Sequence, residues 1–249
     1  MLLRIIQIIT TLFILASLIL QLIALLGNFP KLRSVYISKI TITSTTGGIF
    51  ANLLSSIPDY FTVGVFIICQ GFYINTANNL CAPSSFGYEY ESTGLLQTIQ
   101  EALPSSTHST LKGVQGGIMI PSVCFCCIVL LNEFRIYIKP NKGWFLHVFT
   151  FIVAVISLLL SAAFFAVLVA IYYIINNVIN DEKSVVLGGN LGRFVSITTE
   201  KGSAIWISMV AFILMFFACC LMLVRFIFHR RARSVHQNSH RHEMSSTAY

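Results

Sequence analysis

Four long apolar runs restrict what this chain can fold into more than any other feature of its sequence. The first run, residues 5–26, is almost unbroken Leu and Ile. As an α-helix it is about 33 Å long, enough to cross the roughly 30 Å hydrocarbon core of a bilayer. A basic Arg4 before an apolar run is also typical of a cleaved signal peptide, but no small-residue cleavage site follows it cleanly. We therefore expect a transmembrane helix.

The other three runs cover residues 114–134, 144–175 and 204–228. Only 10% of the 249 residues are charged, whereas a soluble domain has about 25%. The third run is about 48 Å long as a helix, so it must project beyond the hydrocarbon core. The sequence predicts a single four-span membrane domain, an all-α bundle of four transmembrane helices.

The segment between the first two runs, residues 28–113, is long enough to hold a small β-sheet. β-Branched residues are dense in 35–43 and 60–69, and aromatic residues alternate with other types in 86–91. Apolar residues at helical spacing predict a short helix at 94–103. The shorter second loop, 176–203, carries mixed charges. We expect a small extracellular sheet that rests on the membrane.

Charge distribution predicts the orientation of the chain. The basic residues near one set of span ends account for the whole formal charge of +7, and the two long loops sum to zero. These residues are Arg4, Arg135, Lys139, Lys142, Arg225, Arg230, Arg231, Arg233 and Arg241, offset by Glu133 and Glu243. The positive-inside rule makes that side the cytosol. Both termini and the link 135–143 are then cytosolic, and the charge gives no reason to expect a nucleic-acid partner.

The basic tail, residues 229–249, follows the fourth span. We interpret Arg225, Arg230, Arg231 and Arg233 as attracted to anionic lipid, or equally as an ordinary stop-transfer cluster. Ser234 follows the basic cluster in a setting that suits a basophilic kinase, and phosphate there would partly neutralise the cluster. The tail histidines fit a solvated polar segment better than a metal site.

Cys69 and Cys81 are the only two of the seven cysteines outside an apolar run. In the predicted orientation both face an oxidising compartment, where they can form a disulfide. Such a bridge would contribute about 3 kcal/mol to a segment too small for a deep core. Two unpaired thiols are the alternative.

With this topology, the motif of Gly64, Phe66, Cys69 and Cys81 resembles the fungal Sur/PalI family of plasma-membrane proteins, within the claudin-like superfamily. Phe66 stands where the family usually has Trp; Phe keeps the apolar anchor but has no indole N–H, so any hydrogen bond usually made at this position is not implied here. The resemblance implies a claudin-like fold and a plasma-membrane location. It also implies roles in membrane domains of the eisosome type, in cell-wall and stress responses, or in assisting an ambient-pH receptor.

Small residues recur at four-residue spacing in two of the spans. Ala162, Ala166 and Ala170 lie in the third span, and Gly113 and Gly117 lie at the outer end of the second. Such ladders let another helix backbone approach closely. We expect packing within one bundle, with self-association as the alternative.

Polar residues within the spans are few. Gln7, Gln21, Gln115 and His147 are the main ones, and no Asp, Glu, Lys or Arg lies near the middle of any span. Proton relays and ion pathways depend on such groups, so a transporter is disfavoured. We expect the four polar residues to form interhelical or interfacial hydrogen bonds.

Five further cysteines lie inside the spans and are best explained as small packing residues. Clustered cysteines also suggest a metal site, but no matching His or carboxylate lies near them in the sequence. Palmitoylation of Cys219 or Cys220 is a weaker alternative, because both are deep in their span. The five are Cys124, Cys126, Cys127, Cys219 and Cys220.

The sequence contains no phosphate-binding loop, zinc-protease motif or nucleophile elbow. We therefore predict a non-enzymatic protein without a cofactor. The first hypothesis is a membrane organiser that associates with lipid or with copies of itself. The alternative is an auxiliary subunit or trafficking chaperone of a larger polytopic partner, such as a pH-sensing receptor, a channel or a wall-polymer synthase.

Overall fold

The structure is a computed structural model that describes residues 2–29, 32–44, 58–73, 80–86, 105–138, 144–181 and 195–246. Side chains are not described for residues 2, 44, 105–108, 144, 178–181, 195–196 and 229–246. The predicted helix at 94–103 and nearly all of the predicted strand at 86–91 lie outside the described residues.

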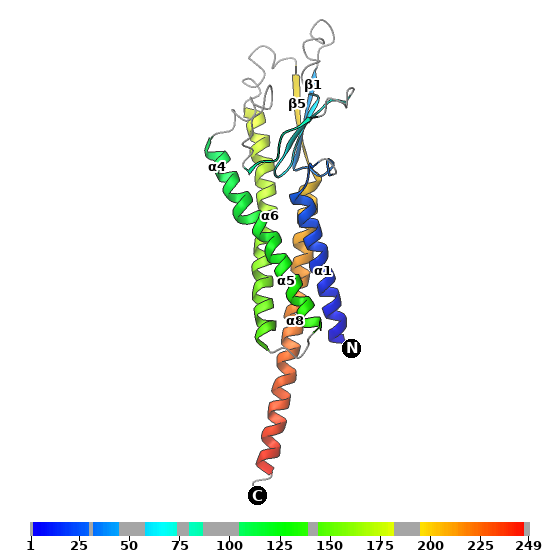
Figure 1. The fold of residues 1–249 in the computed structure, drawn as a ribbon, viewed down its shortest axis with the longest axis vertical. Helices are drawn as coiled ribbons and strands as arrows, with labels where there is room; N and C mark the ends of the chain where they lie inside the picture. Colours follow the sequence, from blue (N-terminus) through cyan, green and yellow to red (C-terminus); the bar gives the residue numbers. More distant parts are fainter. Residues whose placement is uncertain are drawn as a thin grey trace.

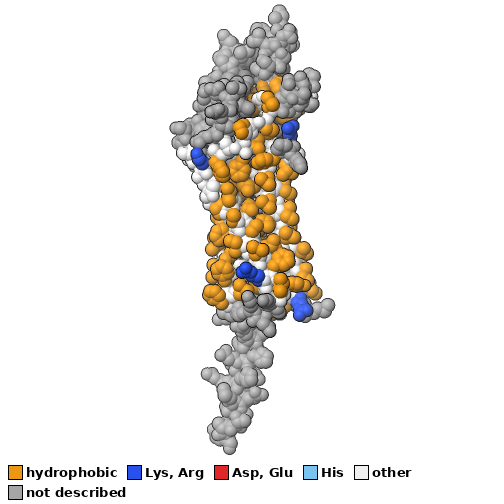
Figure 2. Space-filling view, viewed as in Figure 1, with side chains coloured by type: hydrophobic (Ala, Val, Ile, Leu, Met, Phe, Trp, Pro, Cys, Tyr) orange, Lys and Arg blue, Asp and Glu red, His pale blue; other side chains and the backbone are white. Residues whose placement is uncertain are grey.

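Four long helices lie side by side and form a bundle (Figure 1). They are α1 (Leu2–Leu25), α5 (Ile120–Ile138), α6 (Trp144–Asp181) and α8 (Ser203–Ser246). Each belongs to a segment long and apolar enough to cross a membrane. Apolar side chains cover the visible face of the bundle, and the few basic side chains on that face lie towards its two ends (Figure 2). The chain is a multi-pass membrane protein with four transmembrane helices, as predicted.

The second span changes its helical pitch near its start. It begins as α4 (Ser105–Val114), passes through the π-helical turn η3 (Gln115–Met119) and continues as α5. Within η3 the N–H of Ile120 donates to the carbonyl of Gln115. Pro121 has no N–H to donate to the carbonyl of Gly117, so a regular α-helical ladder cannot pass this point.

A five-stranded antiparallel sheet lies at one end of the bundle, in the order β4-β3-β2-β1-β5. The strands are β1 (Ser38–Ser44), β2 (Tyr60–Val63), β3 (Ile68–Gly71), β4 (Leu80–Cys81) and β5 (Val195–Lys201). The predicted sheet is therefore confirmed. The sequence did not reveal β5, which lies in the second loop and pairs with β1 along its whole length.

One face of the sheet rests on α6, which extends past the bundle (Figure 1). The Lys201 ammonium of β5 lies 5.4 Å from the centre of the Tyr172 ring, and Thr199 donates a hydrogen bond to Asn176. On the same face, the side chain of Phe61 is fully buried. The extended part of the third helix thus supports the sheet.

Both termini lie at the end of the bundle opposite the sheet (Figure 1). There α8 does not stop at the end of the fourth span but continues as a helix to Ser246. The predicted basic tail is therefore helical. The side chains of Arg230, Arg231, Arg233 and Ser234 are outside the described part, so their predicted roles remain predictions.

Candidate functional site

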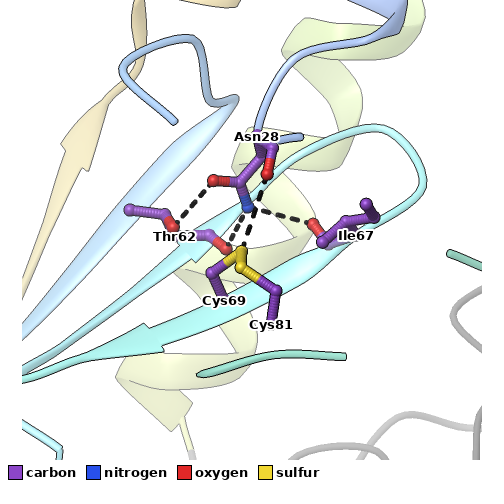
Figure 3. The surroundings of a disulfide bond; sticks show 5 residues. All are labelled: Asn28, Thr62, Ile67, Cys69 and Cys81. Carbon is purple, nitrogen blue, oxygen red and sulfur yellow. Dashed lines mark hydrogen bonds between the residues drawn. A yellow bond between two sulfur atoms is a disulfide. The ribbon is translucent and has the colours of Figure 1, made fainter. Parts of the chain in front are cut away.

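The predicted disulfide is present between Cys69 and Cys81, with the sulfur atoms 2.01 Å apart (Figure 3). The two residues are direct partners across β3 and β4. Strand pairing brings their side chains to the same face, which lets the bridge form. This confirms the pairing and excludes the two free thiols.

Asn28 holds the β2–β3 hairpin against the end of α1 (Figure 3). Its side chain is fully buried, and Nδ2 donates to the carbonyls of Thr62 at 2.8 Å and Ile67 at 3.1 Å. The Thr62 hydroxyl in turn donates to Oδ1 of Asn28 at 3.0 Å. Asn28 has φ of 71°, a left-handed conformation that Asn tolerates better than most residues. One short side chain therefore satisfies three polar groups of the hairpin.

The disulfide also touches this residue. Sγ of Cys69 lies 3.6 Å from the carbonyl oxygen of Asn28. A disulfide sulfur carries no proton, so this is a packing contact and not a hydrogen bond. The bridge and Asn28 together tie three segments of the outer layer to α1.

Gly64 and Phe66 of the predicted motif lie in the turn of the same hairpin. A Cβ at Gly64 would lie 2.6 Å from both Cβ of Asn28 and the carbonyl oxygen of Gly27, so only glycine allows this approach. The half-buried Phe66 ring packs edge-on against Phe86, with 5.2 Å between ring centres. The motif residues thus surround the junction between sheet and bundle.

Gln115 connects this junction to the second span. Its Nε2 donates to the carbonyl of Val65 at 2.6 Å, and its side chain is fully buried. The π-helical turn that begins at Gln115 is in direct contact with the hairpin through this bond. The predicted hydrogen-bonding role of Gln115 is confirmed.

A second polar cluster lies inside the bundle around Gln21. Its Nε2 lies 3.2 Å from Oγ of Ser161 and 3.4 Å from Oγ of Ser17, while Ser122 donates to its Oε1 at 3.0 Å. Ser17 donates to the carbonyl of Ala211 on α8 at 2.8 Å. The cluster therefore connects all four helices, and the predicted interhelical role of Gln21 is confirmed.

A buried ion pair joins α5 to α8 near the end opposite the sheet. Arg225 donates two hydrogen bonds to the carboxylate of Glu133, at 2.7 and 2.6 Å. Glu133 is fully buried and Arg225 is 7% exposed. The prediction that Arg225 faces lipid is wrong, because its guanidinium is buried against Glu133. The pair forms because a buried carboxylate without a partner would cost far more than this bidentate contact.

A small hollow adjoins the ion pair. It is lined by Glu133, Arg225, His147 and Thr150 among others, with a cavity volume of about 10 Å³. That is room for about one water molecule. The half-buried His147 therefore belongs to a tightly packed interhelical site and not to a ligand pocket.

The cysteines inside the spans divide into two groups. The thiols of Cys126 and Cys219 face carbonyls of neighbouring helices, at 3.8 Å from Ile14 and 3.4 Å from Ala154. Cys124 and Cys220 are exposed on the bundle surface and Cys127 is half-buried. No cluster of metal ligands occurs among the described residues.

The predicted small-residue ladders lie on the outside of the bundle. Ala166 and Ala170 are exposed and Ala162 is half-buried, whereas the neighbouring Phe164 and Leu168 face the core. The exposed Gly113 and Gly117 also face open space, because a Cβ built on either would meet nothing within 4 Å. These four exposed residues do not pack within one bundle, contrary to the expectation, and self-association remains a prediction for them.

Two of these features escaped the sequence analysis although a signal was present. Asn28 follows Gly27 directly after the first apolar run, and an Asn there is a known left-handed helix ending. The charge distribution groups Glu133 and Arg225 with the charges at the span ends, yet each residue lies inside an apolar span. Ionisable residues in such positions usually pair with one another.

The comparison with known proteins agrees with the topology and the motif. The model of the SUR7/PalI family matches residues 6–218, which include the second and third spans, most of the first and fourth spans, and both strand-forming loops. No curated protein shows significant similarity to the chain.

Proposed function

The chain belongs to the SUR7/PalI family, and from this membership and its outward-facing small residues we propose that it is a non-enzymatic organiser of the plasma membrane. It associates with copies of itself or with lipid to build membrane domains of the eisosome type that contribute to cell-wall integrity. Both termini are cytosolic and the sheet faces the outside.

The exposure of the small residues is the observation that carries this proposal. Ala166 and Ala170 on α6 are exposed although their side chains are among the smallest. A lipid-facing helix gains nothing from such a low ridge, whereas a second helix can approach it closely and make dispersion contacts. The exposed Gly113 and Gly117 offer the same close approach on α4 and η3.

The polar groups inside the bundle support an organiser over a transporter. The Gln21 amide is engaged with three serines, and Glu133 and Arg225 satisfy each other. A pathway for ions or protons needs polar groups that are free to exchange partners along a continuous route. Among the described residues, these two clusters are closed.

The proposed orientation is supported by charge and by the disulfide. Arg4, Arg135 and Arg225 lie near the span ends opposite the sheet, as the positive-inside rule requires for a cytosolic side. Disulfides persist in oxidising compartments, and the bridge lies at the sheet end.

The mass of the native complex in lipid nanodiscs tests the proposal. We expect a homo-oligomer for the native chain and a smaller assembly for Ala166→Leu combined with Ala170→Leu. Val210→Leu is the matched control, because Val210 is 44% exposed on α8, away from the ridge. An unchanged oligomer in the double variant would remove the ridge from the proposal.

The same measurement separates the alternative function. A larger polytopic protein in fixed stoichiometry would make the chain an auxiliary subunit or trafficking chaperone. The α6 ridge would then be the candidate interface with that partner. A monomer with neither partner nor ordered lipid would contradict both functions.

A further inference from the structure

The sheet carries a hollow that the family motif does not include. Its volume is about 260 Å³, and it is open to the outside. This outer hollow is lined by Arg33, Tyr36, Lys39, Tyr60, Thr62, Phe72 and Tyr73. Binding sites for drug-sized molecules are usually larger, at about 300–1,000 Å³, so the outer hollow suits a smaller chemical group.

Strand pairing shows which face of the sheet carries the outer hollow. Lys39 of β1 is the direct partner of Thr62 on β2, so their side chains share one face. Lys201 is the partner of the neighbouring Ser38, so it points to the opposite face, towards α6. The outer hollow therefore lies on the face that α6 does not cover.

Two tyrosine rings hold the Lys39 ammonium in place. Tyr60 and Tyr73 are 5.2 Å apart between ring centres, and Nζ of Lys39 lies 5.0 and 5.4 Å from those centres. The Tyr60 ring occupies the space beside Gly71, where a Cβ would come within 2.2 Å of it. Cation–π contacts of this kind fix a charge without neutralising it.

Lys39 remains charged in this setting. Partial burial lowers its pKa, but a hydrogen bond with Tyr73 and the nearby Tyr36 and Glu200 groups outweigh burial and raise the pKa above its ordinary value. The ammonium is therefore fully protonated at neutral pH. The second cation, Arg33, is exposed at the rim.

Among the described residues that line the outer hollow, the charged ones are both cations. The Asp59 carboxylate nearby accepts a hydrogen bond from the backbone N–H of Tyr73 at 2.6 Å. Glu200 is beside Lys39 on β5 and is exposed, but it does not line the outer hollow. Arg and Lys offer only donors, so a ligand that fits must bring acceptor oxygens and negative charge.

The position of the outer hollow limits where such a ligand comes from. The carbonyl of Tyr36 accepts a hydrogen bond from the N–H of Ala204, in the first turn of α8. A short connection joins the end of α1 at Leu25 to Arg33. One rim of the outer hollow therefore lies level with the ends of two spans, where phospholipid headgroups are found.

We propose that the outer hollow binds a phosphate ester, presented by a phospholipid headgroup of the leaflet on the sheet side. Arg33 and Lys39 bind the phosphate oxygens, and Tyr36 contacts the rest of the headgroup. This site is independent of the α6 ridge, so it does not depend on self-association.

Native mass spectrometry of the full chain in a neutral detergent tests this site. The probes are phosphatidylglycerol, which carries the phosphate on a lipid, and glycerol 1-phosphate, which carries it in solution. We expect Arg33→Gln combined with Lys39→Gln to weaken phosphatidylglycerol binding at least roughly tenfold, since two charge-assisted contacts are lost. Lys112→Gln is the control, because Lys112 lies on α4 at the sheet end of the bundle but does not line the outer hollow.

Each outcome decides the proposal. Selective loss of phosphatidylglycerol binding in the double variant, with no binding of glycerol 1-phosphate, supports a lipid headgroup. Binding of both probes, lost in the double variant, supports the phosphate site and assigns it to soluble esters as well. Equal binding by the double variant and the Lys112→Gln control overturns the site. Oligomer size is read in the same spectra, so failure of this site is distinguishable from failure of the organiser function.

Discussion

Arg225 of α8 and Glu133 of α5 form a two-bond ion pair that is almost completely enclosed by the bundle. Removal of one partner leaves the other charge buried without compensation. We expect Arg225→Met to lower the free energy of unfolding by about 3 kcal/mol, measured by equilibrium unfolding in micelles. The double variant Glu133→Leu with Arg225→Met should recover most of this loss, since it leaves no unpaired charge.

The exposed Arg135 provides the control for the ion pair. Arg135→Gln should change the free energy of unfolding by less than about 0.5 kcal/mol. If Arg225→Met and Arg135→Gln changed the free energy of unfolding equally, the ion pair would have no stabilising role of its own.

Asn28 combines a left-handed backbone with three side-chain hydrogen bonds. Asn28→Gly can still adopt the left-handed backbone conformation but loses the three hydrogen bonds, which should lower the free energy of unfolding by about 2 kcal/mol. Asn28→Ala loses the bonds and also strains the backbone, which adds about 1 kcal/mol. Thermal unfolding in nanodiscs should therefore rank native, Gly and Ala in descending stability. An Ala variant as stable as the Gly variant would contradict the role of the backbone.

The disulfide closes a short loop between β3 and β4, with a sequence separation of 12. Cys69→Ser combined with Cys81→Ser should cost about 3 kcal/mol by the chain-entropy model. Reductant should lower the midpoint of thermal unfolding for the native chain and leave the double variant unchanged. Cys124→Ser, at an exposed cysteine in the second span, should respond to reductant as the native chain does.

Gln21 connects three serines on three helices. Gln21→Leu should cost about 1 kcal/mol, the usual scale for hydrogen bonds inside membrane proteins. Nε2 of Gln7 has no hydrogen-bond partner among the described residues, so Gln7→Leu should cost less than about 0.5 kcal/mol. A larger loss for Gln7→Leu in equilibrium unfolding would contradict the assignment of the cluster.

Several structural features could be predicted because their signals are local in the sequence. The apolar length of residues 144–175 predicted an over-long helix, and α6 has 38 residues and extends past the bundle to the sheet (Figure 1). The position of Cys69 and Cys81 outside the apolar runs predicted their bridge. By contrast, β5 was hidden in a loop of mixed charge, because its pairing with β1 joins residues far apart in the chain.

The sequence by itself determined that this is a four-span membrane protein with a small disulfide-linked sheet, because apolar length, strand-forming composition and cysteine position are properties of single segments. Only the tertiary structure decided that Arg225 pairs with Glu133, that the cluster around Gln21 joins four helices and that Ala166 faces outwards. These facts depend on how each helix is rotated about its axis against its neighbours. That rotation is set by packing of the whole bundle, to which every helix contributes.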